Sequence, residues 1–166
     1  MTLKTILVPT DFSEPSTAAL NYAKQLADAL NASIHVLHVA EDPLRQPWTL
    51  ETYGISPLDV LGDITAQAQK DLGKALPESE RKKYNAELVT AVGSPFSEIV
   101  NYARKNSIDL IVMGTHGRGG LAHVVLGSVT ERVVRFAPCP VLTVRAQAEI
   151  SQRTIAEAGA AVAATQ

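Results

Sequence analysis

The chain has 166 residues, of which 46% are hydrophobic and 19% are charged. These fractions are ordinary for one folded domain with a sizeable core, and they exclude a disordered or fibrous chain. The formal net charge of -2, with no basic run interleaved with aromatic residues, argues against binding to nucleic acid or to an anionic membrane.

The amino-terminal segment 1–12 fits neither a signal peptide nor a membrane span, because its apolar stretch is short and is interrupted by Pro9 and Asp11. The single cysteine, Cys139, cannot form an internal disulfide. We therefore expect a cytoplasmic protein in a reducing environment.

The first predicted unit is a strand, a helix and a second strand. Thr5 to Val8 is apolar and suits a strand buried on both faces, which we expect Pro9 to end. Ser13 is a good N-cap for a helix that continues to Asn31, because small and apolar residues recur between them at helical spacing. Ser33 to Val39 predicts the next strand, so the unit is a βαβ motif with parallel strands.

The rest of the chain continues the alternation after a long connection. From Ala40 to Pro57 the sequence loses its periodicity, which indicates either a surface excursion or a lid over a binding site. The charged segment Pro77 to Lys83 is interpreted as a solvated turn. The predicted elements are helix Leu58 to Leu76, strand Ala86 to Val92, helix Phe96 to Asn106, strand Asp109 to Met113, helix Ser128 to Phe136 and strand Val141 to Val144.

Strands that alternate with helices predict a doubly wound α/β fold, with a five-stranded parallel sheet of order 3-2-1-4-5 and helices on both faces. We expect one domain over residues 1–145, and a tail over 146–166 that is either a loosely docked helix or disordered. Such sheets bind ligands beyond the carboxyl ends of their strands, where the strand order reverses. The loops after the first and fourth strands are therefore the predicted site.

The most specific motif is the glycine-rich stretch that follows the fourth strand. Gly114 and Gly117 lack a Cβ that would obstruct phosphates, and we expect them to take positive φ and turn N–H groups inward as an anion nest. Gly127 and Ser128 begin the last helix, whose free N–H groups favour anions by about 0.3–1 kcal/mol each. Arg118 adds a positive charge. The stretch predicts phosphate binding, but it lacks the lysine of a P-loop.

These segments resemble the universal stress protein family, and specifically its ATP-binding branch. The pattern Gly-x2-Gly-x9-Gly-Ser/Thr of that branch is matched by Gly114, Gly117, Gly127 and Ser128. Further agreement comes from ILVPTDFS at Ile6, GSPFSEIVNYA at Gly93, DLIVMGTHGRGG at Asp109 and APCPVLTVR at Ala137. The resemblance covers about residues 1–145 and implies a Rossmann-like fold of the adenine nucleotide α hydrolase type.

The resemblance implies ATP as the ligand, with Mg²⁺ or Mn²⁺ coordinated mainly by phosphate oxygens and water. Asp11 has an ordinary alternative as a turn residue, and His116 as a loop histidine. His35 and His38 face opposite sides of one strand, so we predict no dedicated metal site. The implied ATP-binding residues are Pro9, Thr10, Asp11, Val39, Met113, Gly114, His116, Gly117, Arg118, Gly127, Ser128, Val129 and Thr130.

The leading hypothesis is an ATP-binding regulatory protein with a role in stress responses, as the resemblance implies. A slow ATPase, or an enzyme that autophosphorylates Ser128 or Thr130, is the competing class, although no catalytic base, lysine or metal-binding carboxylate pair is identifiable. A third class is an interaction module whose glycine loop is empty. The short apolar edge strand Val141 to Val144 predicts a two-fold homodimer, to which the resemblance also points.

Overall fold

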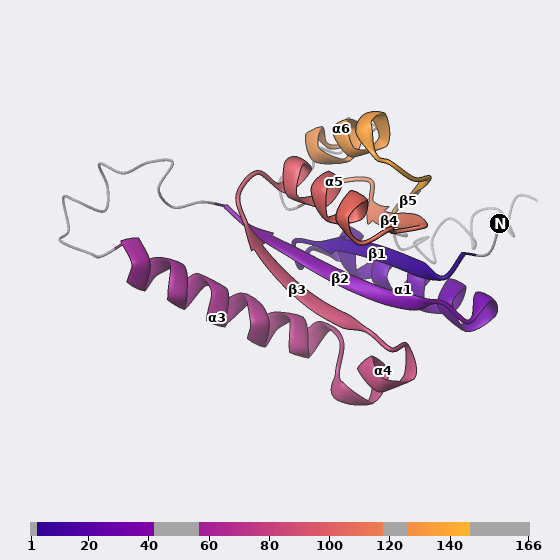
Figure 1. Ribbon diagram of the computed structural model, residues 1–166, viewed down its shortest axis with the longest axis horizontal. Coiled ribbons are helices and arrows are strands. Elements are labelled where there is room, and N and C mark those ends of the chain that lie inside the picture. The colour runs from indigo at the N-terminus through magenta and orange to yellow at the C-terminus, as the bar shows by residue number, and fades with distance from the viewer. Residues whose placement is uncertain (1–2, 42–56, 118–125, 147–166) are drawn as a thin grey trace, which may run out of the picture.

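The computed structural model describes residues 3–41, 57–117 and 126–146, which form a twisted sheet flanked by helices (Figure 1). The five strands are joined in the predicted order β3-β2-β1-β4-β5, and every pairing is parallel. The strands are β1 Thr5–Thr10, β2 Ser33–Ala40, β3 Glu87–Val92, β4 Leu110–Gly114 and β5 Val141–Val144. The helices are α1 Glu14–Leu30, α3 Pro57–Ala75, α4 Glu78–Lys83, α5 Pro95–Lys105 and α6 Ser128–Phe136.

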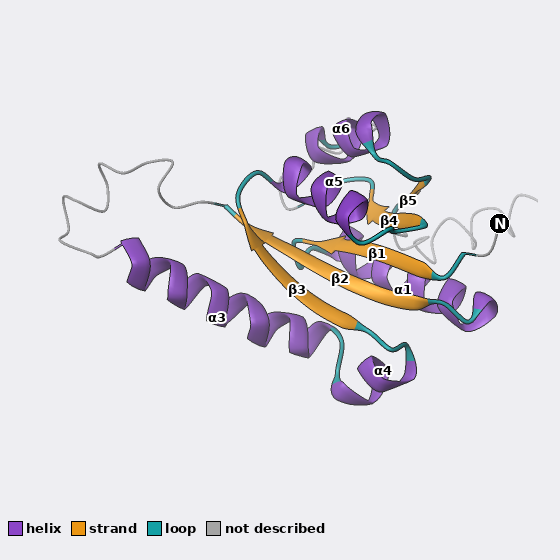
Figure 2. Ribbon diagram, in the orientation of Figure 1, coloured by secondary structure: helices purple, strands orange, loops and turns teal. Residues whose placement is uncertain are grey.

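Helices cover both faces of the sheet, as predicted (Figure 2). Alternate residues of β1 point to opposite faces, which gives the molecule two hydrophobic clusters. Ile6 and Val8 belong to the cluster with α1 and α3, which also contains Leu72. Leu7 belongs to the second cluster, which includes Ile99 of α5 and Val133 of α6. The sheet is therefore buried on both sides, which explains the continuous apolar runs of its central strands.

Helix α1 begins and ends where the sequence predicts. The Ser13 hydroxyl accepts a hydrogen bond from the Ser16 N–H, which is the expected N-cap geometry. At the other end Asn31 adopts the left-handed conformation, with φ of 53°, and its N–H donates to the Ala27 carbonyl. These two caps fix the direction in which the chain leaves β1 and enters β2.

Two local predictions were wrong. Strand β1 does not end before Pro9 but continues to Thr10, paired with β2. Pro9 is accommodated because the pairing of β1 with β4 stops at Leu7, so its missing N–H interrupts no ladder on that side. The charged segment predicted as a turn contains the short helix α4, which has acidic residues in its first turn and basic residues in its last.

Several predictions concern residues outside the described ranges. These are the connection over 42–56, the tail over 147–166 and Arg118. None of the helices in the described part of the chain is both long and apolar enough to cross a membrane.

Candidate functional site

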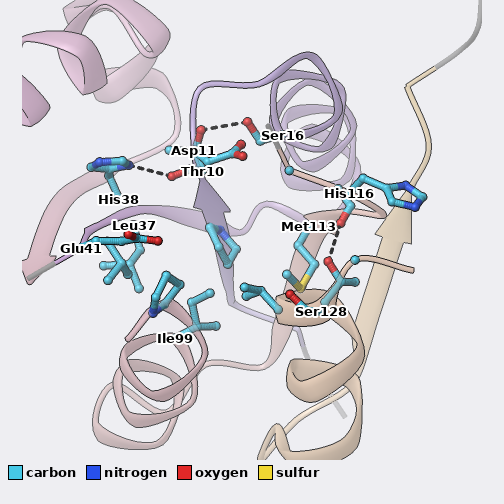
Figure 3. A pocket seen from close by; sticks show the side chains of 18 of the residues that line it. Thr10, Asp11, Ser16, Leu37, His38, Glu41, Ile99, Met113, His116 and Ser128 are labelled. Atoms are coloured by element: carbon cyan, nitrogen blue, oxygen red, sulfur yellow. Dashed lines mark hydrogen bonds between the residues drawn. The ribbon is translucent and has the colours of Figure 1, made fainter. Parts of the chain in front are cut away.

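A cavity of about 630 Å³ lies at the carboxyl ends of β1, β2 and β4 (Figure 3). It forms where the central strands separate, because β1 pairs with β4 only through Ile6 and Leu7, whereas its pairing with β2 continues to Thr10. The strand order reverses at this point, as the sequence predicts for the site. The volume is within the range of about 300–1,000 Å³ typical of small-molecule sites.

Every predicted binding residue that the structure describes lines this cavity. They come from separate segments of the chain: the end of β1, the end of β2, the residues around the end of β4, and the start of α6. The predicted residues that meet there are Pro9, Thr10, Asp11, Val39, Met113, Gly114, His116, Gly117, Gly127, Ser128, Val129 and Thr130. Their convergence is a finding, whereas their binding of nucleotide stays a prediction.

The loop after β1 is shaped by hydrogen bonds of its own side chains. Thr10 Oγ1 accepts the Phe12 N–H at 3.0 Å and lies 3.1 Å from Ser16 Oγ. Asp11 Oδ1 accepts the backbone N–H of Ser13 at 3.1 Å and its hydroxyl at 2.5 Å. Phe12 has a φ of 62°, which is uncommon for a bulky residue. Asp11 therefore forms a turn and lines the cavity at the same time.

Gly114 at the end of β4 and Gly117 after it allow close packing, which the sequence did not predict. Neither adopts positive φ, so the expectation of left-handed glycines was wrong, whereas their place beside phosphates stays a prediction. Gly114 is needed for close packing, because a Cβ there would lie 2.8 Å from the backbone carbonyl carbon of Pro15. A Cβ at Gly117 would lie 2.5 Å from Asp11 Oδ2. Gly114 thus lets β4 lie against the start of α1, and Gly117 lets the segment after β4 approach the loop after β1.

The start of α6 forms the wall opposite β1. Gly127 is its N-cap residue, and the Gly127 N–H donates to the Thr115 carbonyl at 2.8 Å. Thr130 is buried and its hydroxyl donates to the Gly114 carbonyl at 3.0 Å, so it does not fit a role as an autophosphorylation site. Ser128 is exposed at the first helical position, where N–H groups have no partner within the helix.

Some residues that line the cavity were not predicted from the sequence. The missed residues of β2 flank Val39, and the rule that ligands lie beyond the carboxyl ends of strands could have found them. Those of α5 are four residues apart, on one face of the helix that follows β3. Ser16 lies one turn into α1. The missed lining residues are Ser16, Leu37, His38, Ala40, Glu41, Pro95 and Ile99.

The cavity has an apolar part and a polar part. Apolar side chains such as Leu37, Ile99 and Met113 suit a flat hydrophobic group, whereas the β1 loop and the start of α6 supply polar groups. Among the described lining residues there is no lysine or arginine. Nor do the described residues contain a group of three or more His, Cys, Asp or Glu placed to hold a metal ion. Within the described lining, backbone N–H groups and the dipole of α6 are available to a polyanion, whereas Arg118 lies outside the described residues.

A doubly wound parallel sheet with a cavity at its switch point defines a class of α/β proteins that bind small ligands in this crevice. A model described as the Universal stress protein family matches residues 2–145. The chain belongs to this family.

Individual relatives agree with the family assignment. Universal stress protein MJ0531 of Methanocaldococcus jannaschii is 35% identical over 148 residues, which cover 86% of this chain and 82% of the relative. Universal stress protein YxiE of Bacillus subtilis is 33% identical over 144 residues, covering 84% of this chain and 97% of the relative.

Solved structures share the fold. Universal stress protein UspA from Lactobacillus plantarum superimposes with a TM-score of 0.74 at 28% identity, covering 87% of this chain and 99% of that one. A universal stress protein crystallised in complex with cAMP has a TM-score of 0.60 at 25% identity, covering 89% of this chain and 100% of that chain.

Proposed function

We propose that this chain binds ATP in the cavity between the β1 loop and α6, and that the bound nucleotide regulates a stress response without fast catalysis. The observation that carries the proposal is the convergence of the predicted residues from β1, β2, β4 and α6 on one cavity. The cAMP complex of a structural relative supports a nucleotide as the ligand class.

The two parts of the cavity match the two ends of a nucleotide. We place the adenine against Leu37, Val39 and Ile99, and the phosphates at Ser128 and the N–H groups of the first turn of α6. Because the described lining has no lysine or arginine, we expect Mg²⁺ or Mn²⁺ to accompany ATP through its phosphate oxygens and water. Binding should therefore weaken when the divalent ion is chelated.

The direct test is calorimetric titration of nucleotide-free protein with ATP and Mg²⁺, using a variant that blocks the phosphate end. Ser128→Glu places a negative charge at an exposed helix start, which favours the helix but repels phosphates. We expect ATP affinity to fall about tenfold or more. The control Gln25→Glu adds the same charge on the exposed surface of α1 and should bind as the parent does.

Two outcomes contradict this proposal. Absence of saturable binding to the parent protein would leave the cavity without its proposed ligand. Equal ATP affinity for Ser128→Glu and the parent would place the phosphates somewhere other than the start of α6.

We further propose that two copies of the chain pair through β5 to form a two-fold dimer in the cytoplasm. In the described sheet β5 pairs only with β4, so its outer edge has unpaired backbone groups that suit a second strand. We assign the α/β fold to one domain over 1–145 and treat 146–166 as an appended tail. Sedimentation at micromolar concentration, with and without ATP, should show a dimer, and a monomer under both conditions contradicts the pairing.

A further inference from the structure

Two histidines of β2 have opposite surroundings. His35 and His38 are three residues apart, so their side chains leave the strand on opposite faces. The His35 ring lies 2.8 Å, through Nδ1, from the Tyr102 hydroxyl of α5, and His35 is not among the residues that line the cavity. His38 lines the cavity and faces the loop after β1 (Figure 3). The proposed nucleotide contacts give His38 no role.

The hydrogen bond of His38 defines which ring nitrogen carries a proton in its neutral form. Its Nδ1 lies 2.9 Å from the backbone carbonyl oxygen of Thr10, the residue opposite it in the β1–β2 ladder. A carbonyl oxygen can only accept, so Nδ1 carries the proton, and in the neutral ring Nε2 is left as an acceptor. The ring also packs against Phe12, with centroids 4.5 Å apart.

The contacts of His38 with Thr10 and Phe12 hold the end of β1, where β1 still pairs with β2 but no longer with β4. Beyond Leu7, β1 no longer pairs with β4, so β2 is the one strand of the described sheet that pairs with Thr10. Phe12 takes its uncommon φ of 62° immediately after this point. A residue in such a conformation persists only where its surroundings impose it. His38 supplies a hydrogen bond before Asp11 and a packing surface after it.

We propose that His38 is a positioning residue of the cavity, which holds Thr10 and Phe12 so that Asp11 between them is presented to the ligand. The inference rests on the proposed nucleotide function, but its structural part holds without ligand. In the absence of the Nδ1–H donor, the Thr10 carbonyl loses its side-chain partner and keeps only its place in the β1–β2 ladder, so the loop samples other conformations. Ligand binding then has to order the loop, which lowers affinity.

The substitutions that test this role separate the hydrogen bond from the bulk of the ring. His38→Leu removes the donor and should weaken ATP binding about tenfold, since a lost hydrogen bond and a loosened loop act together. His38→Asn places an amide N–H near the position of Nδ1 and should recover most of this loss. His35→Leu, at a residue of the same strand that does not line the cavity, breaks the contacts with Tyr102 and Glu87 and should leave ATP affinity unchanged.

Two measurements on the ligand-free protein make the test independent of nucleotide. Nitrogen NMR of the histidine rings should show His38 protonated at Nδ1 and unprotonated at Nε2. Amide hydrogen exchange at Phe12 and Ser13 should accelerate in His38→Leu, and much less in His38→Asn or His35→Leu. A ring protonated only at Nε2, or equal exchange in all variants, overturns the positioning role even if the parent protein binds ATP.

The outcomes for the two proposals are distinguishable. ATP binding by the parent that His38→Leu leaves unchanged removes the role of His38 and keeps the proposed function. Failure of the parent to bind ATP removes the proposed function, while the tautomer and the exchange rates still decide whether His38 holds the loop. An affinity loss in His38→Leu that His38→Asn does not recover assigns the effect to ring packing and overturns the hydrogen-bond mechanism.

Discussion

The two loops that face each other across the cavity hold their shape in different ways. The loop after β1 uses short polar side chains, since Thr10 Oγ1 and Asp11 Oδ1 each accept a backbone N–H from two residues further along. Ser13 then caps α1. This loop depends on side-chain hydrogen bonds, which belong to residue types that favour turns wherever they occur.

The segment around the end of β4 relies on close approach. Gly114 lets the backbone of β4 lie against Pro15 at the start of α1, and Gly117 leaves room for the Asp11 carboxylate. Thr130 then ties the Gly114 carbonyl to α6. The segment around the end of β4 requires the absence of side-chain atoms at its glycines. An added methyl group at Gly114 should therefore destabilise this segment, whereas a lost hydroxyl should destabilise the loop after β1.

The largest effect is expected for Gly114→Ala. The new Cβ would lie 2.8 Å from Pro15 C and 2.9 Å from Pro15 O, which are backbone atoms that cannot rotate away. Helix α1 would have to shift from β4, and we expect the free energy of unfolding to fall by about 3 kcal/mol. Urea unfolding measures this loss.

The matched control is Gly62→Ala on α3, where a Cβ meets nothing within 4 Å. Alanine should stabilise this helical position by about 0.5–1 kcal/mol. If the two alanine variants unfold alike, close approach is not what requires glycine at position 114.

The second largest loss in the free energy of unfolding is expected for Thr130→Val. It keeps the shape of the side chain but removes the hydroxyl that donates to the Gly114 carbonyl in a buried position. An unsatisfied buried carbonyl costs about 2 kcal/mol, which should appear in the same unfolding measurement. Thr130→Ser retains the hydroxyl, and a loss as large as that of valine would show that packing dominates over the hydrogen bond.

On the opposite side of the cavity, Ser13→Ala removes the N-cap of α1 and the donor to Asp11. We expect a loss of about 1 kcal/mol in the free energy of unfolding, smaller than at Gly114 because water can reach the freed groups. Ser13→Thr preserves both interactions and should remain close to the parent protein. An alanine variant as stable as the parent would contradict the view that side-chain hydrogen bonds hold this loop.

The contrast between the loops explains what the sequence could and could not predict. Ser13 and Asn31 are recognisable caps, so the ends of α1 were predicted correctly. The alternation of strands with helices predicted a doubly wound sheet of order 3-2-1-4-5, which is confirmed. Helix α4 was missed because its stability depends on charges at both ends and on ion pairs such as Glu78–Arg81 at 3.0 Å, which give no apolar period.

The site was predicted mainly from a glycine motif, which specifies residue types at a fixed spacing in the sequence but no distances in space. Gly114 and Gly117 were found, but the positive φ expected of them was wrong, and their close approach to Pro15 and Asp11 was missed because it depends on how α1 packs on β4. His35 and His38 were predicted only to face opposite sides of their strand, whereas the bond of His38 to the Thr10 carbonyl follows from the β1–β2 register. Tertiary distances of this kind are absent from local sequence.

The smallest effect on stability, and the sharpest comparison of the two loops, is expected for Gly117→Ala. Gly117 is exposed and does not use positive φ, so alanine itself introduces little strain. Its Cβ would lie 2.5 Å from Asp11 Oδ2, the mobile end of a side chain, so the carboxylate can move aside. We expect the free energy of unfolding to change by less than about 0.5 kcal/mol.

If Asp11 contacts the ligand, ATP affinity of Gly117→Ala should nevertheless fall about fivefold. A double-mutant cycle with Asp11→Ala decides whether this loss acts through the carboxylate, because Gly117→Ala should then cause no further loss in the Asp11→Ala background. Additive losses of affinity would instead mean that the methyl group at position 117 obstructs the ligand directly, and that the two loops act on the ligand independently.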